Sequence, residues 1–197
     1  NRKKMLSLEE SLKILKETKA LIEGHFILSS GLHSPKYVQC AQLMSKPSQA
    51  VQICESLAKK IKSKLNDIDL ILSPAMGGIV VGYEIGKLLG IETIFSERVN
   101  GKFVLRRDFK IKQGANVLIV EDVITTGKSS IECSTLVTVN KANISGYACI
   151  IDRSNGETEI NDKIISQIKL NIPTYKKENL PKELISIDPV KPGSRNL

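Results

Sequence analysis

An alternation of short apolar runs with helical patterns, between residues 68 and 152, constrains the fold more than any other feature of this sequence. The apolar runs cover residues 68–74, 91–99, 116–122 and 144–152, and the helical patterns cover residues 77–90 and about 129–141. Strands that are apolar along their whole length are typical of a parallel sheet with helices on both faces. The sequence therefore predicts an α/β fold with a central, mostly parallel sheet flanked by helices.

One strand is expected to depart from this parallel arrangement. Asn100 and Gly101 form a two-residue signal for a tight hairpin, because both central positions of such a turn favour residues that tolerate a positive φ. Residues 102–109 are therefore expected to return antiparallel to residues 91–99.

The N-terminal part carries two helical patterns separated by a segment of different composition. Ser7 and Glu10 have the spacing of a capping box, and the apolar positions after them predict a helix to about residue 22. A second helix is expected over residues 48–65. Residues 24–40 are rich in Gly, Ser and Pro and predict turns and short strands.

The composition is that of an ordinary globular protein, with no linker-like stretch, so residues 1–197 are expected to form one domain. The formal charge of +8 comes from basic residues spread along the chain, which favours small anionic ligands over nucleic acid. Four cysteines without CxxC spacing and only two histidines argue against zinc and favour a reduced, cytoplasmic location. The sequence has neither a secretory signal pattern nor an apolar run approaching 18 residues, so no membrane partner is expected.

Residues 117–130, VLIVEDVITTGKSS, hold the strongest indication of a binding site. If a strand stops at Asp122 and a helix begins near Ser129, residues 125–128 form a turn. The N–H groups of that turn, together with the helix start and its dipole, bind an anion. Gly127 allows the backbone to approach a phosphate closely. The pattern is not a P-loop, which would require Gly at position 122.

Two carboxylates, Glu121 and Asp122, precede this turn at the end of the predicted strand. Acids in this position commonly accept hydrogen bonds from ribose hydroxyls, so the expected ligand carries a phosphate and a ribose diol. The alternative is that both are ordinary strand-end acids near a helix N-terminus. Residues 73–78 and 152–155 are expected to lie at the same edge of the sheet, where the carboxyl ends of parallel strands meet.

Residues 117–130 resemble the phosphoribosyl-diphosphate signature of the type I phosphoribosyltransferases, in which apolar residues and two acids precede a Thr/Ser-Gly turn. The resemblance implies that Glu121 and Asp122 bind the ribose hydroxyls and act in catalysis, and that residues 125–129 hold the 5-phosphate. Residues 73–79, SPAMGGI, resemble the family's pyrophosphate loop, a second anion site. The residues thus assigned to phosphoribosyl diphosphate are Glu121, Asp122, Val123, Ile124, Thr125, Thr126, Gly127, Lys128, Ser129, Gly77 and Gly78.

Residues 24–40 resemble the N-terminal hood of the orotate phosphoribosyltransferases, and the hood here would comprise mainly residues 1–45. The matching positions are Phe26, Leu28, Ser30, Gly31, Ser34, Pro35 and Tyr37. Arg153 directly follows a predicted strand, and its guanidinium suits the carboxylate of orotate, which purine bases lack. The resemblance implies an orotate site made of Phe26, Tyr37, Thr125 and Arg153.

The resemblance implies a reaction of phosphoribosyl diphosphate with orotate that gives orotidine 5-phosphate and pyrophosphate, in pyrimidine biosynthesis. It further implies a homodimer and a Mg2+ cofactor, which is expected to be bound through substrate oxygens rather than by a dedicated protein site. Three alternatives stay open. One is a purine-base phosphoribosyltransferase, and another is a non-catalytic regulator that senses phosphoribosyl diphosphate and binds nucleic acid. The third is a structural protein that binds a nucleotide, which would not explain the two acids.

The basic residues depart from the family's pattern. Ser29 and Gly77 stand where well-known members carry lysines, and residues 96–109 lack the histidine of the family's mobile loop. The candidates to replace these cations are Arg98, Lys102, Arg106 and Arg107, of which Arg98 and Lys102 are assigned to catalysis. The alternative is that this charged hairpin is simply a solvated sheet edge.

Overall fold

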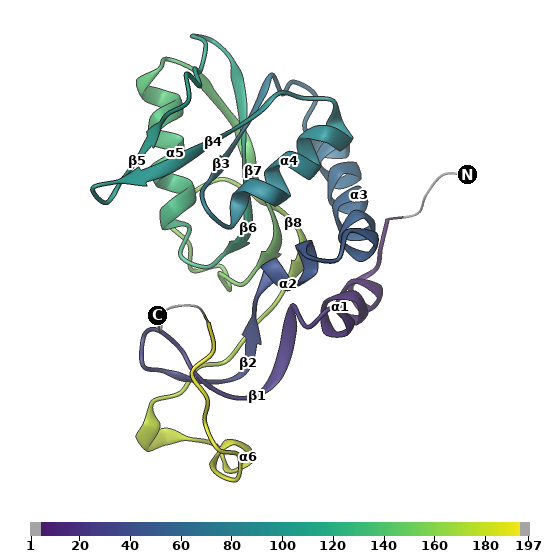
Figure 1. Cartoon of the computed structure of the whole chain (residues 1–197), viewed down its shortest axis with the longest axis vertical. Coiled ribbons are helices and arrows are strands. Elements are labelled where there is room, and N and C mark those ends of the chain that lie inside the picture. The colour runs from purple at the N-terminus through teal and green to yellow at the C-terminus, as the bar shows by residue number, and fades with distance from the viewer. Residues whose placement is uncertain (1–4, 194–197) are drawn as a thin grey trace.

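The computed structural model describes residues 5–193 and confirms the α/β fold, with a six-stranded sheet in the order β5-β4-β3-β6-β7-β8 (Figure 1). The strands are β3 (Leu70–Pro74), β4 (Thr93–Val99), β5 (Lys102–Leu105), β6 (Asn116–Ile124), β7 (Asn143–Asp152) and β8 (Ile164–Lys169). All neighbours pair in parallel except β5, which is antiparallel to β4. The prediction of a mostly parallel sheet is therefore confirmed.

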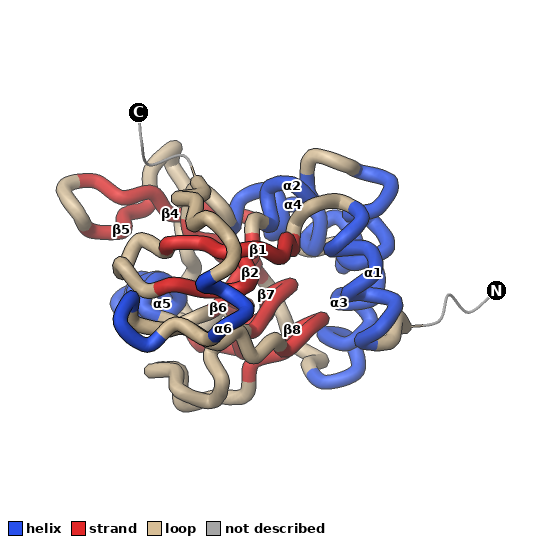
Figure 2. The backbone as a smooth tube through the Cα atoms, turned by 90° about the horizontal axis from the view of Figure 1, so that it is seen from below, coloured by secondary structure: helices blue, strands red, loops and turns tan. Residues whose placement is uncertain are grey.

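Helices cover both faces of this sheet, as Figure 2 shows. The helices are α1 (Leu8–Glu17), α2 (Cys40–Met44), α3 (Pro47–Lys64), α4 (Gly78–Leu89), α5 (Lys128–Val139) and α6 (Lys182–Ile185). Helices α1, α3 and α4 bury their apolar faces with Leu118 and Val120 of β6, whereas α5 packs on the opposite face with Val117 and Ile119. Each strand of the sheet centre is thus buried on both sides, which explains its continuous apolar sequence.

The first helix begins as predicted but ends earlier. Ser7 and Glu10 form the capping box, with N–H to side-chain distances of 3.1 and 2.8 Å. The helix was expected to reach residue 22, yet it ends at Glu17. The hydroxyl of Thr18 donates to the carbonyl of Ile14 at 2.8 Å, and Lys19 has a φ of +62°, which ends the helix. Residues 21 and 22 instead begin a strand.

The hairpin at Asn100 and Gly101 is confirmed, since both residues have positive φ, +51° and +80°, as a tight hairpin turn requires. The returning strand is shorter than predicted. It stops at Leu105 instead of continuing to residue 109, because Arg107 and Asp108 also have positive φ and cannot extend a ladder.

Helix α4 approaches the sheet closely through glycines at four-residue spacing. A Cβ at Gly82 would collide with the side chain of Ser73 on β3, and one at Gly86 would collide with Thr93 on β4. The first of these contacts seals the Ser73 hydroxyl under the helix, where it has no hydrogen-bond partner among the described residues. This close packing of α4 holds the loop that joins β3 to α4 near the sheet.

The hood combines an N-terminal hairpin with segments from the C-terminal part of the chain. Its centre is the antiparallel pair β1 (Leu21–Ile27) and β2 (His33–Val38), but helix α1 packs on α3 and β8 of the main body. C-terminal segments complete the hood, with bridges from His33 to Tyr175 and from Phe26 to Val190. Figure 1 shows this C-terminal part, in yellow-green, lying beside β1 and β2. The hairpin of the hood thus lies within residues 1–45, and distant chain from the C-terminal part covers both of its edges.

Replacement of Gly82 by alanine tests the close packing of α4. We expect Gly82→Ala to lower the free energy of unfolding by about 1–3 kcal/mol, because overpacking outweighs the better helix propensity of alanine. Urea unfolding measures the change, and Lys87→Ala on the exposed side of the same helix is the control, with an expected change within about 0.5 kcal/mol. A stabilised Gly82→Ala protein would contradict the packing described above.

Candidate active site

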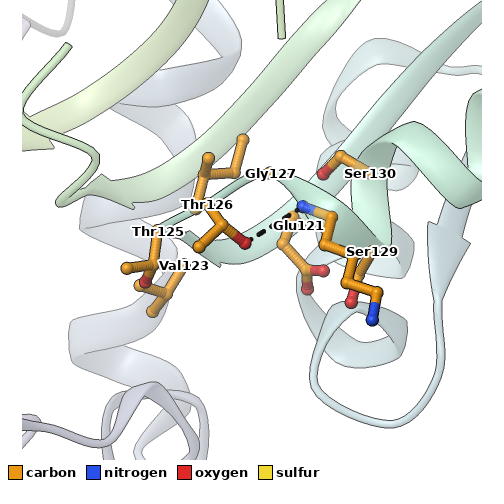
Figure 3. Close-up of a pocket in the computed structure, with 9 residues that line it drawn as sticks. Glu121, Val123, Thr125, Thr126, Gly127, Ser129 and Ser130 are labelled. Carbon is orange, nitrogen blue, oxygen red and sulfur yellow. Dashed lines mark hydrogen bonds between the residues drawn. The ribbon is translucent and has the colours of Figure 1, made fainter. Parts of the chain in front are cut away.

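A cavity of about 170 Å³ lies at the carboxyl end of β6, where the strand turns into α5 (Figure 3). The residues that line it are Glu121, Val123, Ile124, Thr125, Thr126, Gly127, Lys128, Ser129 and Ser130. The sequence predicted all but Ser130 of these as binding residues. The structure therefore gathers the acid Glu121 and the whole predicted turn around one small cavity.

The strand and the helix that frame this turn are both longer than predicted. Strand β6 continues past Asp122 to Ile124, because Ile124 pairs with Asp152 of β7. Helix α5 begins at Lys128 instead of Ser129. The side chain of Ile124 is buried in the core, so this residue can offer a ligand only its backbone. The free turn is consequently limited to residues 125–127.

The start of α5 offers N–H groups for an anion. Its N-cap is Gly127, which has no side chain to cap the helix, and the hydroxyl of Thr126 accepts only the N–H of Lys128, at 3.3 Å. The hydroxyls of Ser129 and Ser130 lie around the same cavity (Figure 3). Uncapped N–H groups, hydroxyls and the helix dipole together can bind an anion such as a phosphate.

Gly127 is required for two reasons. Its φ of +82° lies in the left-handed region, and a Cβ there would lie 2.6 Å from the hydroxyl oxygen of Thr158 and 2.8 Å from Ile160. Thr158 also donates its hydroxyl to the carbonyl of Thr126 at 3.1 Å, and Glu159 donates its N–H to the same carbonyl at 3.0 Å. Sequence reasoning missed this brace after β7, because no local signal links residues 158–160 to the turn.

The two acids lie between this turn and the loop before α4. A Cβ at Gly77 would lie 2.8 Å from a carboxylate oxygen of Asp122, and one at Gly78 would lie 3.2 Å from a carboxylate oxygen of Glu121. The predicted pyrophosphate loop is thus directly packed on both acids, and side chains at either glycine would displace them.

Glu121 and Asp122 have different environments although they are adjacent. The side chain of Glu121 is buried, and burial together with the negative charge of Asp122 raises the pKa of Glu121 to about 9. Asp122 is half-buried and accepts the N–H of Val123 at 2.8 Å. Burial of Glu121 beside Asp122 therefore disfavours its ionised form, which limits the negative charge at this strand end.

The predicted orotate residues lie where β7 meets the hood. Arg153 is half-buried, and burial lowers the pKa of its guanidinium, an effect that the neighbouring Tyr37 opposes. That guanidinium forms no hydrogen bond or ion pair with any of residues 5–193. The ring of Phe26 packs on Tyr37 with centroids 5.8 Å apart, but it is only 5% exposed. Phe26 thus supports Tyr37 from inside the hood and has little surface for a ligand.

The turn that carries Arg153 has its own support, which sequence reasoning also missed. One carboxylate oxygen of Asp152 accepts both the N–H of Ser154, at 2.9 Å, and its hydroxyl, at 2.6 Å. The N–H of Arg153 donates to the carbonyl of Ile124 at 2.9 Å. These bonds fix the backbone on both sides of Arg153 and hold it at the end of β6.

The structure does not bring the predicted catalytic cations Arg98 and Lys102 into the cavity. The guanidinium of Arg98 donates to Glu132 of α5 at 2.7 Å and to the carbonyl of Gly101 at 2.9 Å, and it covers the ring of Phe103. Lys102 is exposed on the hairpin. Arg106 and Arg107 both pair with Glu97. Among the described residues that line the cavity, Lys128 alone carries a positive charge.

No group of three or more His, Cys, Asp or Glu side chains in residues 5–193 is arranged to hold a metal ion. The acidic side chains at the site whose oxygens could bind a metal ion are Glu121 and Asp122. None of the helices in this range has both the length and the apolar character needed to cross a bilayer.

Comparison with known proteins places this geometry in a family. Residues 41–182 match the family model described as the phosphoribosyl transferase domain. A curated relative from Rhizorhabdus wittichii, named orotate phosphoribosyltransferase, is 45% identical over 188 residues, which are 95% of this chain and 96% of the relative.

Solved structures share the fold at lower identity. The orotate phosphoribosyltransferase of Aeropyrum pernix aligns with a TM-score of 0.70 at 23% identity, covering 80% of this chain and 92% of that one. The adenine phosphoribosyltransferase of Thermoanaerobacter pseudethanolicus aligns with a TM-score of 0.56 at 20% identity, covering 68% and 88%. Structures named for orotate and for adenine thus share this fold, so the fold does not distinguish the base. The relative at 45% identity is named for orotate. The chain belongs to the phosphoribosyl transferase family and, within it, to the orotate phosphoribosyltransferases.

Proposed function

We propose that this protein transfers the phosphoribosyl group of phosphoribosyl diphosphate to orotate, giving orotidine 5-phosphate and pyrophosphate. The observation that carries the proposal is the half-buried guanidinium of Arg153, which lacks an ionic partner within residues 5–193 and lies beside the hood residue Tyr37. A half-buried guanidinium is partly shielded from water and is stabilised by an anion. The carboxylate of a ligand suits it, because a carboxylate can accept two parallel hydrogen bonds. Orotate brings such a carboxylate to the base end of the site.

Each end of the site then has a separate task. In this proposal the 5-phosphate binds the N–H groups and hydroxyls of residues 125–130, which line the cavity. The ribose hydroxyls then bind Glu121, which also lines the cavity, and Asp122, which lies beside Gly77. The ring nitrogen of orotate, which enters already anionic, displaces pyrophosphate at the anomeric carbon. Catalysis therefore comes from alignment of the two substrates and from stabilisation of charge as the groups separate.

The raised pKa of Glu121 suits this reaction. Two ionised carboxylates would repel the charged substrate, and burial disfavours ionisation of Glu121. Each of the two acids still offers an oxygen that accepts a hydrogen bond from a ribose hydroxyl.

Mg2+ fits this site as an ion that enters with phosphoribosyl diphosphate. Such an ion keeps water and substrate oxygens as most of its ligands and takes one or two carboxylates from a protein. Asp122, which is half-buried beside Gly77, is the residue that would hold it, and the ion would neutralise charge on the leaving pyrophosphate.

A second copy of the chain is the proposed partner. Met76 in the pyrophosphate loop and Val80 and Tyr83 on the outer face of α4 are 83%, 54% and 67% exposed. These residues form one apolar stripe that begins at the site. A copy docked on this stripe would bring its own basic side chains close to a cavity in which Lys128 is the one cation among the described lining residues.

A cytoplasmic location is proposed from the cysteines. Cys40, Cys54, Cys133 and Cys149 are all free and buried, and burial raises the pKa of Cys54 and Cys133 to about 12. Such thiols act as small apolar side chains and suit a reducing compartment.

The purine alternative is less well supported, because adenine, guanine and hypoxanthine have no carboxylate and would leave Arg153 unpaired. The regulatory alternative leaves the hood and Arg153 without a ligand. Both alternatives would keep the phosphate turn and the acids, so they are separated by what binds at Arg153.

Replacement of Arg153 tests the base end. We expect Arg153→Ala to raise the KM for orotate about tenfold or more, the scale of a charge-assisted hydrogen bond. Binding of phosphoribosyl diphosphate, measured by calorimetry, should change less than about twofold, because its phosphate end lies on the turn before α5. Lys163→Ala, which removes an exposed positive charge after the same strand, is the control. Equal weakening of both substrates would contradict the assignment.

Replacement of Glu121 tests whether its pKa is raised in the folded protein. In the wild type, the folded state keeps a proton that the unfolded chain releases above pH 4.5, so this carboxyl lowers stability progressively until about pH 9. The side chain of Glu121→Gln cannot ionise, so this variant lacks that loss of stability. The difference in free energy of unfolding, variant minus wild type, should therefore increase as the pH rises from 4.5 to about 9. Urea unfolding at several pH values measures the gap, and Glu157→Gln, at an exposed acid, should follow the wild type. A gap that does not change with pH would contradict a raised pKa.

The proposed dimer is tested at Tyr83. We expect the wild type to sediment as a dimer, and Tyr83→Arg to sediment as a monomer that loses most of its activity, because a buried charge without a partner disrupts an apolar interface. Val139→Arg places the same charge at an exposed apolar residue on α5 and should remain dimeric. Full activity of a monomeric Tyr83→Arg protein would contradict the need for a second copy.

A further inference from the structure

The two histidines of the chain, His25 and His33, lie side by side in the hood with ring centroids 4.9 Å apart. Their side chains are among the most buried polar groups, at 3% and 5% exposure. Nε2 of His25 is 2.6 Å from Nδ1 of His33, and Nδ1 of His25 is 2.8 Å from the carbonyl oxygen of Ile187. The two rings therefore connect β1, β2 and the C-terminal segment.

These partners determine where the protons lie. A carbonyl oxygen only accepts, so Nδ1 of His25 carries a proton. In a neutral ring Nε2 of His25 is then an acceptor, and the proton between the rings belongs to Nδ1 of His33. Both neutral rings are thus in the Nδ1–H tautomer, in a chain that donates from His33 to His25 to Ile187.

Backbone hydrogen bonds hold the C-terminal segment along both edges of the same hairpin. On the β1 edge, Val190 donates to the carbonyl of His25 and Ile27 donates to the carbonyl of Val190, each at 2.9 Å. On the β2 edge, His33 and Tyr175 exchange two bonds of 2.8 Å. A two-stranded hairpin alone is marginally stable, so the shape of the hood depends on these connections, which the imidazole chain links across the hairpin.

The residue whose position depends on these connections is Tyr37, near the end of β2. It lies beside Arg153, and the C-terminal segment reaches it, since a Cβ at Gly193 would be 3.1 Å from the Tyr37 hydroxyl. Movement of the C-terminal segment would therefore change the space between Tyr37 and Arg153, where the base is expected to bind.

We propose that His25 and His33 are positioning residues that lock residues 173–193 across the hood and thereby hold Tyr37 beside Arg153, which sets the affinity for orotate. This inference rests on the proposed function. Both rings are buried inside the hood and act through Tyr37, so they influence substrate binding without contact with the reacting atoms.

The tautomers of the wild type give a direct test. At pH 8, where an ordinary imidazole is neutral, long-range nitrogen–proton NMR spectra of the untagged chain contain two imidazole rings. We expect both in the Nδ1–H tautomer. Finding either ring as the Nε2–H tautomer would overturn the hydrogen-bond chain, and this measurement requires no variant to fold.

Kinetics of two His33 variants test the effect on binding. His33→Leu removes the donor to His25 and should raise the KM for orotate about tenfold, with kcat and the KM for phosphoribosyl diphosphate changed less than twofold. His33→Asn places an amide N–H near the position of Nδ1 and should restore most of the affinity. A loss shared by both substrates, or no rescue by asparagine, would show a merely structural role and overturn the proposal.

Hydrogen exchange separates this inference from the proposed function. The N–H of Val190, which donates to His25, should exchange faster in His33→Leu than in the wild type, and His33→Asn should restore its protection. Unchanged exchange would overturn the lock. If the wild type consumed no orotate, the proposed function would fail, and the claim about orotate with it, while the tautomers and the exchange would still decide whether the histidines lock the C-terminal segment.

Discussion

The pairing of β6 with β3 on one side and β7 on the other is the constraint on which the site depends. Because the three strands are parallel, their carboxyl ends meet at one edge and bring the loop of residues 75–78, the two acids and Arg153 together. The pair of Ile124 with Asp152 carries β6 beyond the acids, so Glu121 and Asp122 belong to a paired strand. Burial of Glu121, and hence its raised pKa, is a direct result.

Among residues 5–193, few positive charges lie at this edge, although both proposed substrates are anions. The first turn of α5 supplies N–H groups, Lys128 lines the cavity and Arg153 lies at the base end. The hairpin arginines are already engaged, Arg98 with Glu132 and Arg107 with Glu97. Burial disfavours the ionised form of Glu121, which limits negative charge within the site. The exposed apolar stripe of Met76, Val80 and Tyr83 is where we propose that a second chain docks.

Local signals in the sequence predicted much of the fold. The apolar runs predicted the strands, the capping box predicted the start of α1, and Asn100-Gly101 predicted the hairpin. The grouping of residues 121–130 around one cavity was predictable for the same reason, since they are contiguous and lie at one strand end and one helix start.

Features that depend on distant residues were not predictable from the sequence. The C-terminal cover of the hood, the brace of Thr158 on Thr126 and the ion pair of Arg98 with Glu132 each join residues far apart in the chain. Apolar Leu21 and Ile22 fitted the helical pattern, and only the Thr18 hydrogen bond and the positive φ of Lys19 ended the helix before them. The pKa of Glu121 likewise depends on burial, which a sequence does not state.

The most direct test of the account is a comparison of bases in one assay. The protein is mixed with phosphoribosyl diphosphate and Mg2+, and the absorbance of orotate is followed, with adenine, hypoxanthine and uracil in parallel and EDTA as the metal-free control. We expect that orotate alone among the four bases is consumed, with release of pyrophosphate. Consumption of a purine, with orotate unchanged, would contradict the role of Arg153 and the hood on which the account depends.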